Sequence, residues 1–331
     1  MRVLTIFLLL LGVALATTGN LIPLKCPVCQ TATQGTQLFS TNNAAGADRD
    51  LLERAGGGQP ILLQTVTCPR CHYSADTDDF EKSVDPALAT AVKSGTFKMP
   101  AYKTYPDRFS EGLRAKDQPP AWVSHALIAE QMRFRNEPAS KFSHRDMVVV
   151  WCLRFEANPF TDHASEEAWK LILEKVPLNP GESRNRADAE VAAARKAVAD
   201  LSAFPADKRQ LVAGTAAFLL RSHGENSDLL KFLEAYQPEG PMADNWRSVV
   251  DETRQVVALE RTYQEKALAS LQDAIAQRGQ DDQVVLNYLC GELLRRMGKN
   301  ADARAYYEKA STMKPPEWLQ DWIKEQVKLV S

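Results

Sequence analysis

The sequence predicts an α+β protein that is mostly α-helical, with a small N-terminal β module followed by a larger helical domain. Up to about residue 80, short β-like runs alternate with segments rich in Thr, Gln, Gly and Asn. From about residue 83 onward, apolar residues recur at the three- and four-residue spacing of amphipathic helices. Two Cys-Pro-x-Cys motifs lie in the first part and offer covalent or metal cross-links to a module with little apolar surface to bury.

The first residues, MRVLTIFLLLLGVALATTGN, are typical of a secretory signal peptide. Arg2 precedes a largely apolar run from Val3 to Leu15, and Ala14-Leu15-Ala16 provides the small residues of a cleavage site. This run is shorter than the ~20 residues that span a bilayer. We therefore expect residues 1–16 to be removed, leaving an exported protein, periplasmic or secreted, without a stable membrane anchor.

Residues 17–80 form the predicted β module. Its β-like runs are LIPLKC, TQLFS and PILLQTVTC. Between them lies AAGADRDLLERAGGGQP, in which three consecutive glycines and Pro60 indicate a loop. The glycines do not match a phosphate-binding loop, because no Gly-Lys-Ser/Thr follows and the next element is a strand.

Residues 81–331 form the predicted helical domain. Pro, Gly and Asn mark the breaks between its periodic segments. The intervening loops are short, so neighbouring helices should pack as antiparallel hairpins. The expected helices lie near 83–94, 107–116, 120–135, 143–157, 164–175, 184–202, 206–222, 226–236, 243–278, 282–297, 300–313 and 316–329.

The clearest tetratricopeptide-like pattern covers residues 284–317. Within it, Gly291, Ala303, Tyr307 and Ala310 occupy the defining places of that 34-residue repeat. The two small residues should let a pair of helices approach closely, while Tyr307 and Ala310 pack back onto the first helix. Earlier hairpins match the pattern only loosely, so we predict a repeat-like helical domain.

The two Cys-Pro-x-Cys motifs are the strongest candidates for a functional site. Cys26 and Cys29 form the first motif, and Cys68 and Cys71 form the second. Each motif follows a strand-like run, so each can turn the chain and point two thiolates at one place. Two such knuckles supply the four ligands of a tetrahedral Zn²⁺. Because four thiolates leave no open position, the predicted zinc site is structural and not catalytic.

Other uses of these cysteines stay open. Redox-active Cys-x-x-Cys pairs belong at a helix N-terminus, whereas strands precede both motifs here. Export also permits disulfides, with three possible connectivities among the four thiols. Cys68-Pro69-Arg70-Cys71-His72 fits covalent haem attachment, with Met99 as a candidate second axial ligand. The alternative functions are therefore a thiol–disulfide oxidoreductase or redox sensor and, third, a c-type haem protein.

Composition and the remaining motifs argue against several other classes. A formal net charge of −2 gives no broad positive field for nucleic acid. The other histidines are scattered, and neither His-Glu-x-x-His nor Gly-x-Ser-x-Gly occurs. Cys152 and Cys290 fall on apolar helical faces, which favours core packing. We expect a non-enzymatic protein that binds a protein or peptide partner on its helical surface.

The segments KCPVC, GADRDLL, GGGQPILLQTVTCPRCHYSADTDDF and GELLRRMGKNADARAYYEKA together resemble one bacterial family, the domain of unknown function 2225. This resemblance implies a split zinc-knuckle ribbon, with zinc at the four cysteines of the two motifs, followed by tetratricopeptide-like helices. It implies no reaction. Gln30 and His72 stand where such knuckles usually have glycine. The export signal is a second departure, since many relatives resemble cytosolic proteins.

Overall fold

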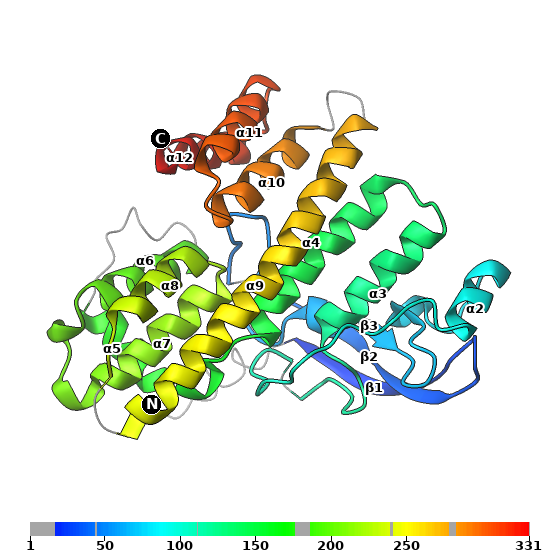
Figure 1. Cartoon of the computed structure of the whole chain (residues 1–331), viewed down its shortest axis with the longest axis horizontal. Coiled ribbons are helices and arrows are strands. Elements are labelled where there is room, and N and C mark those ends of the chain that lie inside the picture. Colours follow the sequence, from blue (N-terminus) through cyan, green and yellow to red (C-terminus); the bar gives the residue numbers. More distant parts are fainter. Residues whose placement is uncertain are drawn as a thin grey trace, which may run out of the picture. The chain divides into compact units, whose positions relative to one another are not determined.

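A computed structural model describes residues 17–43, 45–110, 112–175, 186–238, 241–277 and 283–330. The predicted signal peptide, residues 1–16, lies outside this range. Within it the predicted α+β, mostly α class is confirmed, because the strands all lie near the N-terminus and a long helical region follows (Figure 1). Among the described helices, none has the length and apolar character needed to cross a membrane.

The chain divides into two compact units. We call Met1–Gly46 together with Glu53–Glu137 the N-terminal unit, and Ala47–Leu52 together with Pro138–Ser331 the helical unit. The sequence analysis instead places one boundary at residue 80. The structural boundary lies later because α2 (Pro86–Lys93) and α3 (Ala121–Phe134) fall in the N-terminal unit. The short segment 47–52 also departs from a simple division, because it belongs to the helical unit.

Two antiparallel hairpins form the β part of the N-terminal unit. Strand β1 (Thr18–Lys25) pairs with β2 (Ala32–Ser40), and β3 (Thr65–Thr67) pairs with β4 (Ser74–Asp76). The predicted strand-like runs before both cysteine motifs are therefore present, although the second is shorter than its apolar run indicates. The turn of each hairpin carries one Cys-Pro-x-Cys motif.

Close packing and a side-chain bridge hold the two hairpins together. A Cβ atom added to Gly35 in β2 would lie 2.6 Å from Cγ2 of Val66 in β3, so only glycine permits this approach. The Gln118 side chain accepts from the backbone N–H of Thr67 at 2.7 Å and donates to Thr33 Oγ1 at 2.9 Å. Helix α3 packs against β3 and β4 and gives the unit its helical layer.

The prediction of a helix at residues 107–116 is wrong. Asp107 Oδ1 accepts hydrogen bonds from the backbone N–H groups of Phe109, at 2.9 Å, and Ser110, at 2.8 Å. Such side-chain bonds offer the backbone an alternative to the helix. Gly112 then adopts a left-handed φ of 73°, and the Leu113 carbonyl accepts from a β2 threonine at 2.8 Å.

Nine helices account for the described secondary structure of the helical unit apart from single 3-10 turns. Helix α9 runs along α4 and α10, while α7 packs against α5, α6 and α8 (Figure 1). The helices are α4 (Ala139–Glu156), α5 (Glu166–Lys175), α6 (Arg186–Ala199), α7 (Arg209–Ser222), α8 (Asn226–Ala235), α9 (Pro241–Ala276), α10 (Gln283–Arg296), α11 (Asn300–Thr312) and α12 (Glu317–Leu329). Across both units, the 3-10 turns of the described residues lie at Pro60–Leu62, Thr77–Asp79, Thr161–His163, Leu201–Ala203 and Ala206–Lys208.

Helices α10 and α11 approach closely at a glycine. A Cβ atom added to Gly291 would lie 2.6 Å from Cε1 of the Tyr307 ring. The ring is fully buried, and its hydroxyl donates to Glu292 Oε1 at 2.7 Å, so it has little freedom to move. Ala303 and Ala310 are also fully buried. The packing that the sequence pattern predicts at these positions is thus present.

Gly291→Ala should destabilise the helical unit by about 1–2 kcal/mol. Overpacking a core costs about 1–3 kcal/mol, which exceeds the ~1 kcal/mol that alanine gains over glycine within a helix. Urea denaturation followed by far-UV circular dichroism measures the change. In a Tyr307→Ala background the same substitution should be neutral or stabilising, because the ring is gone. An equal loss in both backgrounds would contradict this contact.

The segment 47–52 places charged side chains within the helical unit. Asp48 Oδ1 lies 2.7 Å from Nδ1 of His223, which directly follows α7. Arg49 contacts both carboxylate oxygens of Asp188 in α6, at 3.0 and 2.8 Å, and reaches Glu325 in α12 at 2.8 Å. Separate helices are thereby joined to one short peptide.

Asp50 lies at the centre of a fully buried charge network. Its Oδ2 is 2.6 Å from Arg154 Nη1 and accepts from Trp151 Nε1 at 3.1 Å, both in α4. Its Oδ1 lies 3.6 Å from Arg296 Nη2 in α10. Arg154 also contacts Glu260 in α9, at 3.2 Å. The side chains of Asp50, Arg154 and Glu260 are inaccessible to solvent, so each charge depends on these partners.

Acidification should destabilise the helical unit. Burial raises the pKa of Asp50, but Arg154 and its neighbours outweigh burial and hold this pKa below its ordinary value. Burial also raises the pKa of Glu225, but the nearby arginines Arg295, Arg296 and Arg195 outweigh burial and lower this pKa to about 2. Carboxyl groups with a lowered pKa contribute stability above their unfolded pKa, near 4, and lose it as the pH falls through the folded pKa. The free energy of unfolding should therefore fall by several kcal/mol between about pH 5 and pH 2, as urea denaturation at each pH can measure. An unchanged value across this range would contradict the role of the ion pairs.

Candidate metal centre

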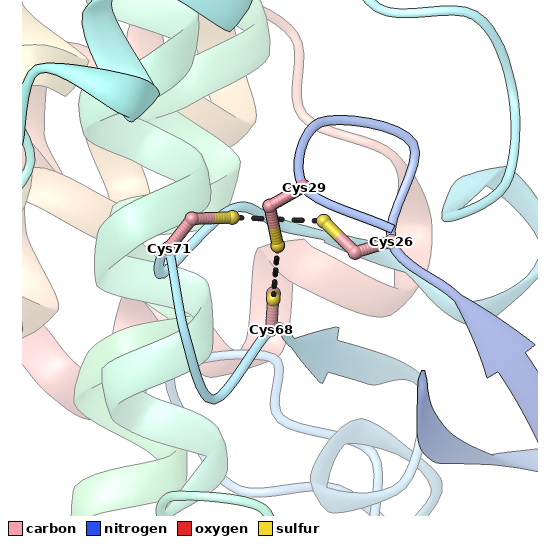
Figure 2. A group of neighbouring side chains, drawn as sticks. All are labelled: Cys26, Cys29, Cys68 and Cys71. Atoms are coloured by element: carbon pink, nitrogen blue, oxygen red, sulfur yellow. Dashed lines mark hydrogen bonds between the residues drawn. The ribbon is translucent and has the colours of Figure 1, made fainter. Parts of the chain in front are cut away.

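The four cysteines predicted as metal ligands come together at the turns of the two hairpins (Figure 2). All four Sγ atoms of Cys26, Cys29, Cys68 and Cys71 lie within 4.8 Å of one another. The close pairs join different hairpins: Cys26 lies 3.6 Å from Cys71, and Cys29 lies 3.4 Å from Cys68. These separations far exceed a disulfide bond of ~2.05 Å, and all four cysteines are free.

The donor set fits a tetrahedral metal ion. Zinc–sulfur bonds of about 2.3 Å place the ligand sulfurs roughly 3.8 Å apart. The close pairs, at 3.4 and 3.6 Å, lie just below this spacing, and the widest separation of at most 4.8 Å is about 1 Å above it. Cys26 and Cys68 are fully buried, whereas Cys29 and Cys71 are partly exposed. A four-thiolate set is compatible with Zn²⁺ and leaves no ligand position for a substrate.

The two turns have the same backbone construction. In the first, the Gln30 N–H donates to the Cys26 carbonyl at 2.9 Å; in the second, the His72 N–H donates to the Cys68 carbonyl at 3.0 Å. Gln30 and His72 have φ values of 63° and 62°, in the left-handed region that favours glycine. The glycine-like position that the family resemblance assigns to these two residues therefore has a physical basis.

His72→Gly should leave metal binding unchanged and alter stability by less than about 1 kcal/mol. Glycine relieves the left-handed strain but gains freedom in the unfolded chain, and the two effects oppose each other. His72→Val should cost more, about 1–2 kcal/mol, because a β-branched residue is disfavoured at positive φ. Metal content and urea denaturation of both variants provide the test. Loss of the metal in His72→Gly would instead indicate that the imidazole is a ligand.

The neighbouring thiols shift one another's pKa values through their hydrogen bonds. The hydrogen bond with Cys71 lowers the pKa of Cys26 to about 5, and the same hydrogen bond raises the pKa of Cys71. Burial raises the pKa of Cys71 further. Burial also raises the pKa of Cys68, because it outweighs the hydrogen bonds from the turn amides, which lower this pKa. A metal ion must displace the protons of the neutral thiols, so its binding weakens as the pH falls.

The geometry does not favour the redox and haem uses of the cysteines. Neither described motif has a helix beginning at it, since β2 and β4 follow the two turns. The two close sulfur pairs also cross between hairpins, whereas a Cys-x-x-Cys redox disulfide forms within one motif. Haem attachment uses only Cys68 and Cys71, but each of these approaches a sulfur of the first motif. The arrangement favours one shared four-thiol clamp over two independent motifs.

Sequence analysis missed the charge network around the segment 47–52. In the sequence, the segment belongs to a loop and to the family pattern, and its partners on α4, α6, α10 and α12 and in the turn after α7 carry no local motif. Cys152 and Cys290, by contrast, are fully buried in α4 and α10, in agreement with the expected core packing.

Comparison with known proteins identifies one family. Residues 23–172 match the sequence profile described as "Uncharacterized protein conserved in bacteria (DUF2225)". The matched region contains both cysteine motifs, the segment 47–52 and helices α2, α3 and α4. No significant match was found among curated proteins or solved structures. The expected resemblance to this family is confirmed over residues 23–172, whereas the segment 291–310 lies outside the match.

Proposed function

We propose that this chain is an exported, non-catalytic bacterial protein that uses a structural zinc site to stabilise its N-terminal unit and its helical unit to bind a protein or peptide. The observation that carries the proposal is the closed cluster of four free thiols from two hairpins. Two of these thiols are fully buried, and the set leaves no position for chemistry on a substrate.

The small size of the second hairpin supports a stabilising role for the metal. Strands β3 and β4 contain three residues each, and two-stranded hairpins are marginally stable by themselves. A metal ion bound at both turns links this hairpin to the longer β1–β2 hairpin. Its binding free energy then contributes directly to folding of the N-terminal unit.

The helical unit supports a role in binding through its tetratricopeptide-like helix pair and an exposed apolar surface. Helices α10 and α11 have the close packing described above, and α12 follows them. On α12, Trp318 and Leu329 are 54% and 63% exposed. Large exposed apolar side chains are the usual anchors of a protein interface.

Metal analysis of natively purified protein tests the proposal. Expression with residues 1–16 present, followed by fractionation, should place the protein outside the cytoplasm. Elemental analysis should find about one equivalent of zinc, and alkylation should find the four thiols reduced but protected until the metal is removed. Less than about half an equivalent of zinc with all four thiols oxidised would overturn the structural-zinc proposal.

Capture of partners from the exported fraction tests the binding role. The wild type and a Trp318→Ser variant should be cross-linked under the same conditions, because only the exposed side chain differs. We expect a discrete partner that the variant binds at least about tenfold more weakly. An equally strong interaction in both proteins would exclude this part of α12 as the binding surface.

One observation favours a second function, that of a thiol–disulfide oxidoreductase or redox sensor. Cys29 and Cys71 are partly exposed and can meet an oxidised partner. This function predicts that substituting one cysteine traps a mixed disulfide on another. Metal-protected thiols in the native protein would exclude it. A native absorption spectrum without a Soret band would likewise exclude haem attachment.

A further inference from the structure

A small cavity in the helical unit lies beside the segment 47–52. It has a volume of about 220 Å³ and is bounded by this segment, α6, the turn after α7, α10 and α12. Pockets for drug-sized ligands usually measure about 300–1,000 Å³, so the cavity suits a smaller molecule.

One side of the cavity presents arginines from the segment 47–52 and from α10. Arg49 Nη1, Arg295 Nε and Arg296 Nε are buried and have no hydrogen-bond acceptor in the part of the chain that the structure describes. The nearest carboxylate oxygen to Arg296 Nε that forms an ion pair with it is Glu292 Oε2, at 3.7 Å, which is beyond hydrogen-bond distance. The Arg296 side chain is only 2% exposed. Buried N–H groups are nearly always paired, so unsatisfied donors around one cavity point to an anionic group such as a carboxylate.

Acceptors for a cationic group line the same cavity. Asp188 and Glu325 each lie 2.8 Å from Arg49 Nη2, and both remain partly exposed. Burial raises the pKa of Asp188 despite Arg49, so a second cation nearby would stabilise its charged form. Gln326, only 2% exposed, has a buried Oε1 without a donor among the described residues. These groups suit an ammonium ion.

The third part of the cavity wall is apolar. Ala187, Val191 and Ala192 lie on one face of α6, and Leu329 approaches from α12. This surface suits a short aliphatic group. Its small side chains leave space that larger residues would fill.

The charges lining the cavity are balanced, which argues for a zwitterion over a phosphate dianion. Four arginines face four carboxylates: Arg49, Arg195, Arg295 and Arg296 against Asp48, Asp188, Glu225 and Glu325. We propose that this cavity binds a free α-amino acid with an aliphatic side chain. The carboxylate contacts the unsatisfied arginine donors, the ammonium group faces the acidic side chains and Gln326, and the side chain packs against α6.

This site goes beyond the proposed metal and partner-binding roles; it is independent of the metal site and shares Leu329 with the apolar surface of α12. Its test uses the full, natively purified protein with its metal content recorded. Isothermal titration calorimetry and thermal unfolding with L-alanine, L-valine and L-leucine should reveal saturable binding of at least one. N-acetyl-L-valine lacks the ammonium group and L-valinamide lacks the carboxylate, so each should bind at least about tenfold more weakly than L-valine.

Two phenylalanine substitutions on α6 form a matched pair. Ala192→Phe fills the cavity and should abolish binding. Ala189→Phe places the same ring on the same helix at a half-buried position that does not line the cavity, and should retain binding. Gln326→Leu is a second, nearly isosteric variant, which should weaken binding at least about fivefold by removing the acceptor. Its folding is checked by circular dichroism.

Several results would overturn the proposal. Binding of none of the three amino acids at 10 mM, roughly the upper end of weak ligand affinities, excludes the site. Unchanged binding in Ala192→Phe places the ligand elsewhere. Equal binding of the blocked derivatives excludes recognition of a zwitterion. None of these results alters the metal content, so failure here is distinguishable from failure of the structural-zinc proposal.

Discussion

Replacing Cys68 by serine should abolish metal binding and unfold the N-terminal unit. Cys68 is fully buried, and its sulfur lies 3.4 Å from that of Cys29, so serine removes one ligand from the centre of the cluster. Structural zinc contributes about 10–16 kcal/mol to the folding of small zinc-finger peptides. That value is comparable to the typical stability of a whole domain, ~5–15 kcal/mol, so its loss is enough to unfold the unit.

Metal analysis and hydrogen exchange measure this effect separately. Cys68→Ser should reduce zinc from about one equivalent to less than a tenth, and backbone amides in β1 to β4 should lose their protection from exchange. A strong chelator should have the same effect on the wild type. Cys290→Ser is the matched control, because this buried cysteine lies in α10, outside the cluster, and should leave the metal in place. Full zinc content in Cys68→Ser would exclude Cys68 as a ligand.

Asp50→Asn should destabilise the helical unit by about 3–5 kcal/mol, the usual loss when one member of a buried ion pair is removed. Asparagine has nearly the same shape, so the effect is one of charge. The change leaves Arg154 with only Glu260 as a close carboxylate in the network and weakens the charge compensation at Arg296. Both guanidinium groups lie almost completely out of water and cannot recover hydration without disrupting the packing.

Urea denaturation monitored by circular dichroism can measure the Asp50→Asn effect. The matched control is Asp251→Asn on α9, where an aspartate that is 59% exposed pairs with Arg254 at 3.2 Å. An exposed pair of this kind contributes about 0–1 kcal/mol, so the control should change little. Similar small losses in both variants would show that Asp50 contributes far less than its burial indicates.

The parts of the structure that sequence analysis predicts well depend on local patterns. The Cys-Pro-x-Cys spacing determines how each turn points its two thiols, and the preceding strand-like runs indicate where the turns lie. Helices such as α3 and α10 follow from apolar periodicity. The contact between Gly291 and Tyr307 follows from their positions in the tetratricopeptide-like pattern. The left-handed conformation at Gln30 and His72 is likewise readable, because both occupy a position that glycine usually fills.

Most of the parts that were missed depend on distant residues, although the turn at Asp107 is local. The helix expected at 107–116 is absent because Asp107 bonds its own turn and a β2 threonine takes the Leu113 carbonyl. The boundary of the N-terminal unit lies beyond residue 80 because α3 packs on β3 and β4, which periodicity cannot show. The cavity arginines lack a motif, since their shared environment exists only after five separate segments meet.

The segment 47–52 has a consequence for the order in which the chain folds. Its contacts close loops of 101 residues from Asp50 to Trp151, 175 residues from Asp48 to His223 and 239 residues from Arg49 to Tyr288. Contacts between such distant residues form late, because the entropy of loop closure is lost before they contribute. During synthesis, Asp50 emerges long before Arg296, so its buried site is incomplete until α10 has been made. A chain that stops before α10 therefore lacks the contact between Asp50 and Arg296 and leaves part of its core exposed, which makes it accessible to proteases. The helical unit can therefore complete its folding around the segment 47–52 only after α10, α11 and α12 have been made.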